Sequence, residues 1–187
     1  IIMQQMMNEK TKYRLAESMK QLVKKKRIDA ITVAEIIQLA DVSRPTFYRH
    51  FRDKYDLVNW FFQKLCDRSF MQMGVSLTIT EALNRKFEFL RGEKDFFAAA
   101  FSCRSQNNLM DYDYHCIYQF YSDFIKKGGE ADFTPEIRFL LEMYCHGSII
   151  MTAQWAVSGM TTPPDKMAAF LVEALPPKLR EKFISLS

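Results

Sequence analysis

The sequence predicts an all-α protein in which an N-terminal three-helix unit of the helix-turn-helix type precedes a larger helical domain. Glycine and proline number only six each in 187 residues, so the chain has few of the turn residues that a many-stranded sheet requires. Apolar residues recur instead at the i, i+3, i+4 spacing of amphipathic helices. The charge is also uneven, because residues 1–65 hold 13 Lys or Arg against 7 Asp or Glu, whereas residues 66–187 hold 13 against 15. A basic N-terminal part on a mildly acidic body favours a module that binds a polyanion, although a solvated helix face would also carry such charge.

The overall composition narrows the class of protein. Apolar residues make up 48% of the chain and aromatic residues 14%, which is typical of a folded globular protein. The four cysteines lie far apart and form no CxxC pair, as expected for reduced thiols in a cytoplasmic protein. No run approaches the roughly 18–20 apolar residues that span a bilayer. We therefore expect a cytoplasmic protein that does not cross a membrane.

Two short helices are predicted in the stretch 32–54. Residues 8–26 form a first helix, whose apolar stripe includes Leu15 and Met19. Thr32-x-x-Glu35 then matches a capping box at the start of a second helix. Asp41-Val42 makes a turn, and Ser43 is a good N-cap for a third helix.

The third helix has two distinct faces. Phe47 and Phe51 are four residues apart and are expected to face the small core. The opposite side carries Pro45, Thr46 and Arg49, and it is flanked by Arg44, Tyr48 and His50. Asp53 is expected to cap a fourth helix over 54–71, so we place the boundary between two domains, 1–53 and 54–187, at this cap.

The second domain is predicted to be wholly helical. Helical patterns cover 80–91, 93–103, 109–127, 135–158 and 165–174, and a short tail follows Pro176-Pro177. The segment 135–158 is apolar on nearly every side, which a helix on the surface of a monomer is not. We therefore expect one side of it to meet the core and the other to meet a second copy of the chain. The 135–158 and 165–174 helices are therefore predicted to form the interface of a homodimer.

The outward face of the third helix has the chemistry of a DNA reader. Arginine can bind guanine with two hydrogen bonds in the major groove, and Thr, Tyr and backbone N–H groups can bind phosphates. Thr32 lies at a helix N-terminus, whose partial positive charge favours another phosphate, and Lys54 could add a further anchor. A helix-turn-helix is also a common packing unit, so the motif by itself does not decide the function.

The same stretch resembles the TetR family of bacterial transcription regulators. The resemblance rests on Thr32, Ile36, Ala40, Val42-Ser43-Arg44, Thr46-Phe47-Tyr48, His50-Phe51, Lys54 and Leu57. It implies an all-α homodimer that binds a double-stranded DNA operator, with an N-terminal DNA-binding domain and a C-terminal regulatory domain. The family's contacts map here onto Thr32, Arg44, Pro45, Thr46, Tyr48, His50 and Lys54, to which we add Ser43 and Arg49. Asp41 replaces the glycine usual in the family's turn, and we expect it to adopt the left-handed backbone there.

One branch of the family is similar over more of the chain. Residues 53–60, residues 96–101 with Gln106-Asn107, and the segment 155–164 resemble regulators of dihydroxyacetone kinase operons. Some members of that branch activate transcription through a protein co-activator. The sequence thus leaves open whether a small molecule or a protein controls this chain.

A ligand pocket, if present, is expected among the aromatic and Met residues of 87–155. Our candidate lining residues are Phe97, Phe101, Tyr114, Tyr118, Met143 and Trp155. For any one of them, ordinary core packing is the alternative. We expect no cofactor and no metal, because the spacing of Cys103, His115, Cys116, Cys145 and His146 matches no zinc pattern.

The sequence opposes two other classes of function, an enzyme and an adaptor that does not read DNA. No Walker loop, GxGxxG, GxSxG or HExxH occurs, so an enzyme is not expected. Asp111, Asp113 and His115 form a polar cluster, which we expect at a helix N-terminus or in a loop. An adaptor that keeps the fold without reading DNA is opposed by the charge split and by the intact set of Arg44, Tyr48 and Lys54.

Overall fold

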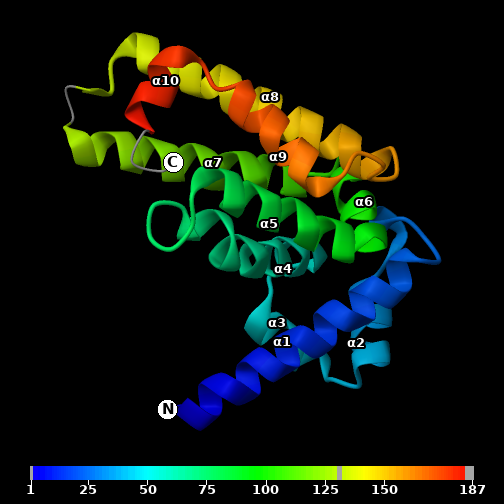
Figure 1. The fold of residues 1–187 in the computed structure, drawn as a ribbon. Coiled ribbons are helices and arrows are strands. Elements are labelled where there is room, and N and C mark those ends of the chain that lie inside the picture. The colour runs from blue at the N-terminus through cyan, green and yellow to red at the C-terminus, as the bar shows by residue number, and fades with distance from the viewer. Residues whose placement is uncertain (1, 130–131, 184–187) are drawn as a thin grey trace.

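A computed structural model describes residues 2–129 and 132–183, and over these residues the chain is helical with no β-strand (Figure 1). The N-terminal part contains α1 (Ile2–Val23), the 3-10 turn η1 (Ile28–Ala30), α2 (Val33–Ala40) and α3 (Arg44–His50). The remainder contains α4 (Lys54–Arg68), η2 (Phe70–Gln72), α5 (Ile79–Gly92), α6 (Lys94–Ser102), α7 (Leu109–Gly128), α8 (Pro135–Val157), α9 (Pro164–Glu173) and α10 (Pro177–Lys182). The predicted all-α class is confirmed. No helix in the described ranges is both long and apolar enough to cross a membrane.

The ends of the helices follow local capping chemistry. Thr32 forms the predicted capping box with Glu35, and Thr78 forms another with Glu81. Ser43 and Asp53 cap α3 and α4 by accepting the backbone N–H three residues ahead. Asp41 ends α2 in the left-handed conformation with φ 50° and ψ 55°, as the turn requires.

Several predicted helix ends differ from the structure. The first helix, predicted over 8–26, spans Ile2–Val23. The fourth helix ends at Arg68 instead of continuing to 71, and its last predicted turn is the 3-10 turn η2. The tail expected after Pro176-Pro177 contains the helix α10, because Pro177 occupies the first helical position, where a missing N–H costs no helical bond. Residues 184–187 of that predicted tail lie outside the described residues.

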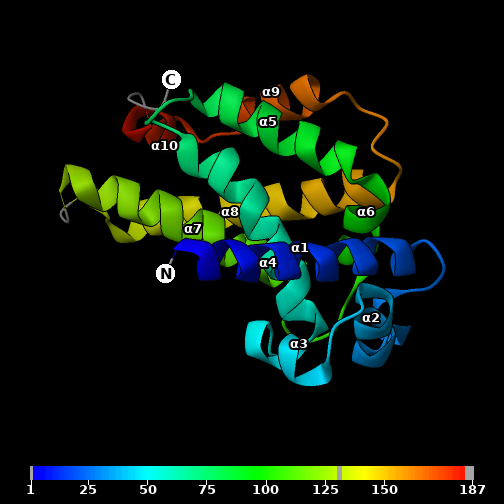
Figure 2. The same cartoon turned by 90° about the horizontal axis from the view of Figure 1, so that it is seen from below.

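A single buried cluster extends from α1 to α10, and α4 joins its two parts. In both views α2 and α3 lie at the edge of the molecule opposite α9 and α10, and α4 runs between them (Figures 1 and 2). Phe61 of α4 contacts Phe96 of α6 edge-to-face, with ring centroids 5.2 Å apart. On the N-terminal side, Phe51 packs against Trp60 of α4 at 5.7 Å. The core of the helix-turn-helix is therefore continuous with that of the larger domain.

The centre of the larger domain holds a buried ion pair that corrects one expectation. Lys86 of α5 and Asp113 of α7 are 5% and 0% exposed, and Nζ lies 2.9 Å from Oδ2. Burial raises the pKa of Asp113, and the Lys86 ammonium opposes that rise. Asp111 lies in the first turn of α7 beside its cap Asn108, as expected. The expectation of a helix N-terminus or loop was wrong for Asp113, which lies in the second turn of α7, in the core.

We predict that Lys86→Met lowers the free energy of unfolding by about 3–5 kcal/mol, because it leaves the Asp113 carboxylate buried without a partner. The double variant Lys86→Met/Asp113→Leu should recover most of that loss. Urea unfolding at one fixed protein concentration measures both, with the exposed Lys94→Met as the control. A loss below about 1 kcal/mol for the single variant would contradict a buried charged pair.

Candidate nucleic-acid interface

The nine residues predicted to contact DNA all reach the surface of the described chain. Ser43, Arg44, Pro45, Tyr48, Arg49 and Thr32 are exposed, and Thr46, His50 and Lys54 are half-buried. Phe47, on the opposite side of α3, is 0% exposed and anchors the helix. The structure therefore gives α3 the two-faced character that its sequence predicts.

Side chains on the outer face of α3 are arranged by their neighbours. The Ser43 and Thr46 hydroxyls lie 2.8 Å apart, and Arg49 donates to Thr46 Oγ1 at 3.2 Å. The Arg44 guanidinium lies 5.6 Å from the centre of the Tyr48 ring, which is cation–π distance. No hydrogen bond or ion pair engages the Arg44 guanidinium within residues 2–129 and 132–183, so its five donors remain available to a ligand.

The neutral ring of His50 is favoured over its cation. Burial lowers its pKa, and the nearby positive charges of Lys12 and Arg49 lower it further. A neutral imidazole can still donate one N–H to a phosphate oxygen. Its contribution would therefore be a hydrogen bond without charge neutralisation.

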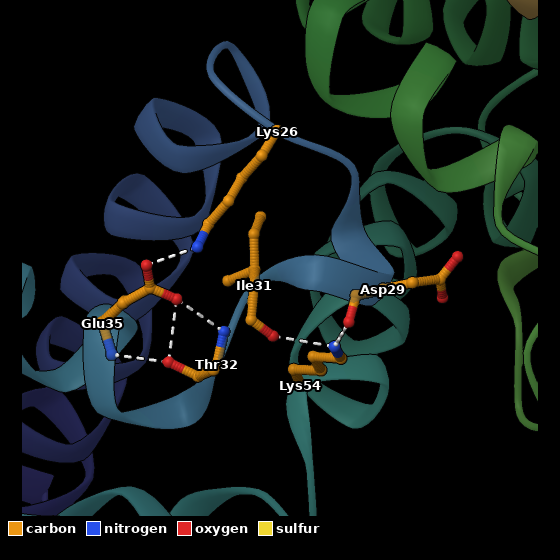
Figure 3. Close-up of polar contacts among 6 residues, drawn as sticks. All are labelled: Lys26, Asp29, Ile31, Thr32, Glu35 and Lys54. Atoms are coloured by element: carbon orange, nitrogen blue, oxygen red, sulfur yellow. Dashed lines mark hydrogen bonds and ion pairs between the residues drawn. The ribbon is translucent and has the colours of Figure 1, made fainter.

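The N-terminus of α2 is closed by its own side chains (Figure 3). The Thr32 hydroxyl donates to Glu35 Oε2 at 2.8 Å and accepts the Glu35 N–H at 3.3 Å. The Glu35 carboxylate also accepts a hydrogen bond from the Thr32 N–H and forms an ion pair with Lys26. The contact with Lys26, followed by those with Thr32, lowers the pKa of Glu35 to about 2. A phosphate at this helix end must therefore share Thr32 with a carboxylate, or use the free N–H groups of the first turn.

Lys54 holds the backbone that leads into α2. Its ammonium donates to the carbonyl oxygens of Asp29 and Ile31, both at 2.7 Å (Figure 3). An ammonium has three N–H donors, so one remains for a phosphate. The predicted DNA anchor is thus also a structural clamp between α4 and the start of α2.

Sequence reasoning missed a second clamp, at the other end of α2. Arg14 of α1 donates to the carbonyl oxygens of Ala40 at 2.5 Å and Asp41 at 3.1 Å. These are the last carbonyls of α2, which have no helical donor. The two partners are 26 and 27 residues from Arg14 along the chain, and no local pattern indicates such a pairing.

The six candidate ligand residues do not line one cavity in the part of the chain that the structure describes. Phe97, Phe101 and Trp155 are at most 5% exposed and belong to the core, whereas Met143 is 62% exposed. Tyr114 stacks on His146 at 4.2 Å. Tyr118 borders a groove of about 680 Å³ between α7 and residues 71–75, and Phe101 borders a different one of about 640 Å³ beside α8.

The cysteines are free thiols, of which Cys66, Cys103 and Cys145 are buried and Cys116 is half-buried. Burial raises the pKa of Cys145 to about 12, so this thiol stays protonated at neutral pH. No three His, Cys, Asp or Glu side chains are grouped to hold a metal ion among the described residues.

Comparison with known proteins identifies the family. Residues 18–59 match the family of bacterial regulatory proteins named tetR, and residues 78–176 match a C-terminal region of transcriptional regulators. The chain belongs to the TetR family. The family predicted from residues 32–57 is thus confirmed, and the chain is a transcriptional regulator with an N-terminal DNA-binding domain and not an enzyme.

Solved structures extend this result to the whole fold. Eight chains of solved structures are similar to this one. One, named "Dihydroxyacetone kinase operon activator DhaS", has a TM-score of 0.62 and 17% sequence identity, and the match covers 95% of this chain and 98% of that one. At 17% identity, the similarity between these two chains shows that they share a fold. No curated protein matches the sequence.

We predict that Lys54→Ala lowers the free energy of unfolding by about 1–2 kcal/mol, because two charge-assisted hydrogen bonds to the backbone are lost. If the third donor binds a phosphate, DNA affinity should also fall nearly uniformly across sequences, and the slope of log K against log[salt] should become shallower by about 0.9. Chemical unfolding and binding titrations at several salt concentrations measure the two effects. The exposed Lys25→Ala serves as a charge-matched control. Unchanged stability would contradict the clamp, and an unchanged slope would contradict the phosphate contact.

Proposed function

We propose that this TetR-family chain acts as a homodimer that reads a palindromic operator through two copies of α3, under the control of a signal received by the larger domain. The observation that supports it best is the outer face of α3. This face presents Arg44, Tyr48 and Arg49 to solvent on a helix anchored from behind by Phe47. The arrangement opposes the alternative of an adaptor that does not read DNA, because an adaptor has no need of this set of donors.

Arg44 is the proposed base reader. Its guanidinium lies at the first position of α3 and has the two parallel N–H groups that match the O6 and N7 atoms of guanine. Tyr48, Thr46 and Arg49 are the proposed partners of the flanking phosphates. In this division of roles Arg44 supplies specificity and the others supply position.

The proposed dimer interface is the outer face of α8 with a contribution from α9. Large apolar side chains are exposed along α8 at Phe139, Met143, Ile150, Met151 and Val157, with exposures from 46% to 62%. On α9 only Phe170 is comparably exposed among the large apolar residues described, at 55%. Gly147 lies among them, and an added Cβ there would meet no atom within 4 Å, so a second helix can approach closely. An apolar strip of this length is typical of an interface between copies.

A small ligand and a partner protein are the two candidate signals for the larger domain, and the packing of its core favours the partner protein. Phe97 and Trp155 fill the core instead of bordering a hollow, and Trp155 donates its indole N–H to the Thr162 carbonyl at 2.9 Å. A core filled in this way suits a regulator driven by a partner protein. The second candidate function is therefore activation of a dihydroxyacetone kinase operon through a protein co-activator, which the similarity of fold to DhaS also supports. A small ligand in one of the surface grooves remains the alternative signal.

We predict that Arg44→Ala weakens binding to the chain's own operator by about 1–3 kcal/mol, because a bidentate contact to a base is lost. The operator is first selected from random DNA with the wild-type protein. Affinities for that operator and for unrelated DNA are then compared, with the exposed Arg85→Ala in the larger domain as the charge-matched control. An equal loss on both DNAs would reassign Arg44 to a phosphate.

We predict that Met143→Glu and Ile150→Glu each convert the dimer into monomers at micromolar concentration, because each would bury a carboxylate at the centre of an apolar interface. Sedimentation velocity measures the change. Val75→Glu is the matched control, because Val75 is an apolar residue that is 81% exposed and lies outside α8 and α9. A wild-type chain that sediments as a monomer would contradict the proposed interface.

A further inference from the structure

Helix α6 is attached to the DNA-binding part at both of its ends. At its N-terminus, Glu93 accepts from Lys20 of α1 at 2.5 Å, and the same ammonium lies 4.4 Å from the centre of the Phe61 ring. Beyond its C-terminus, the Asp29 carboxylate of η1 accepts from the Ser105 hydroxyl at 2.5 Å and from the Cys103 thiol at 3.2 Å. The first contact is an ion pair between helices, and the second is centred on one carboxylate.

Asp29 joins three segments of the chain through its backbone carbonyl and its side-chain carboxylate. Its backbone carbonyl accepts from Lys54, the clamp at the start of α4. Its carboxylate lies 3.1 Å from the Tyr55 hydroxyl, which is also 2.9 Å from Ser105 Oγ and can donate to either. The turn that leads into α2 is therefore tied both to α4 and to the loop between α6 and α7.

Apolar packing alone does not fix this junction. A hollow of about 340 Å³ lies between η1 and α6, bordered by side chains that include Ile28, Ala98, Ala99 and Val157. This hollow is an open groove at the surface, so the hydrogen bonds of Asp29 join η1 to the loop after α6 beside a stretch that side chains do not fill.

The carboxylate is charged at every pH at which the protein would bind DNA. The hydrogen bond from Ser105, followed by that from Cys103, lowers the pKa of Asp29 to about 2. A carboxyl whose pKa is lowered on folding stabilises the fold above its unfolded value, near 3.8, and loses that effect as the pH falls toward 2. The junction is thus not a pH switch near neutral pH.

We propose that Asp29 is a positioning residue, which fixes the orientation of the helix-turn-helix on the larger domain and thereby the half-site separation that the dimer accepts. In a dimer held by α8, the two recognition helices are positioned only through the elements that link α8 to α3. α6 packs against α8 and is tied by Asp29 to the turn that leads into α2. The inference rests on the proposed dimer and palindrome.

The test measures affinity as a function of half-site separation. The wild-type operator is selected from random DNA, and palindromes are made with the separation changed by one and two base pairs in each direction. We expect the wild type to prefer one separation. For Asp29→Asn and Ser105→Ala, affinity at that separation should fall about three- to tenfold, and less at the others, because charge-assisted hydrogen bonds of this kind are lost. The double variant should lose little more than Asp29→Asn alone, since the two residues form one contact.

Asp95→Asn is the matched control, because Asp95 is exposed on α6 and its replacement changes the charge equally. Ser105→Ala changes no charge, so it separates orientation from electrostatics, and it keeps the test valid if Asp29→Asn does not fold. A loss that is the same at every separation would overturn the inference by making Asp29 a local support of α2. Full retention of the wild-type preference by both variants would also overturn it. If the wild type itself shows no preferred separation, the palindromic function fails, and the inference fails with it.

Discussion

The recognition helix has seven residues, which is too few for a helix to be stable in water, so its order depends on the burial of Phe47. Phe47 is 0% exposed and packs against Phe51, with ring centroids 5.9 Å apart. Ser43 supplies the cap, and Pro45 lies in the first turn with its φ already suited to the helix. With the helix fixed in this way, Arg44 and Tyr48 are presented outward at little further entropic cost. Their proposed use as DNA contacts thus depends on the buried Phe47.

The rest of the N-terminal part holds α2 against α1 and α4. Lys26 and Glu35 close its N-terminus, and Arg14 binds its last carbonyl oxygens. Lys54 binds the backbone just ahead of it. Several basic residues that give this part its net charge are therefore held by protein acceptors. The +6 charge of residues 1–65 overstates the number of cations that are free to bind phosphate.

Local signals predicted the helix-turn-helix well because caps and apolar spacing act within four residues. Thr32, Asp41 and Ser43 took the predicted conformations for this reason. The pairings that the sequence did not indicate join residues far apart, such as Lys86 with Asp113 and Asp29 with Ser105. The candidate ligand residues could not be sorted from sequence for a related reason. α7 carries aromatic side chains on several faces. Tyr121 is buried because Phe70, Tyr144 and Phe183, from other parts of the chain, pack against it.

α6 connects the two surfaces that a regulator of this kind must coordinate. It packs on α8, whose other side presents the proposed dimer face, and its two ends bind Lys20 and Asp29. A signal at the larger domain can alter DNA binding only if it changes a contact on that path or shifts α4, because these are the described links to α1–α3. The link through α4 is a dense aromatic cluster around Phe61, which resists displacement. The link through Asp29 consists of hydrogen bonds beside a hollow, so it is the one that can be broken at lower cost.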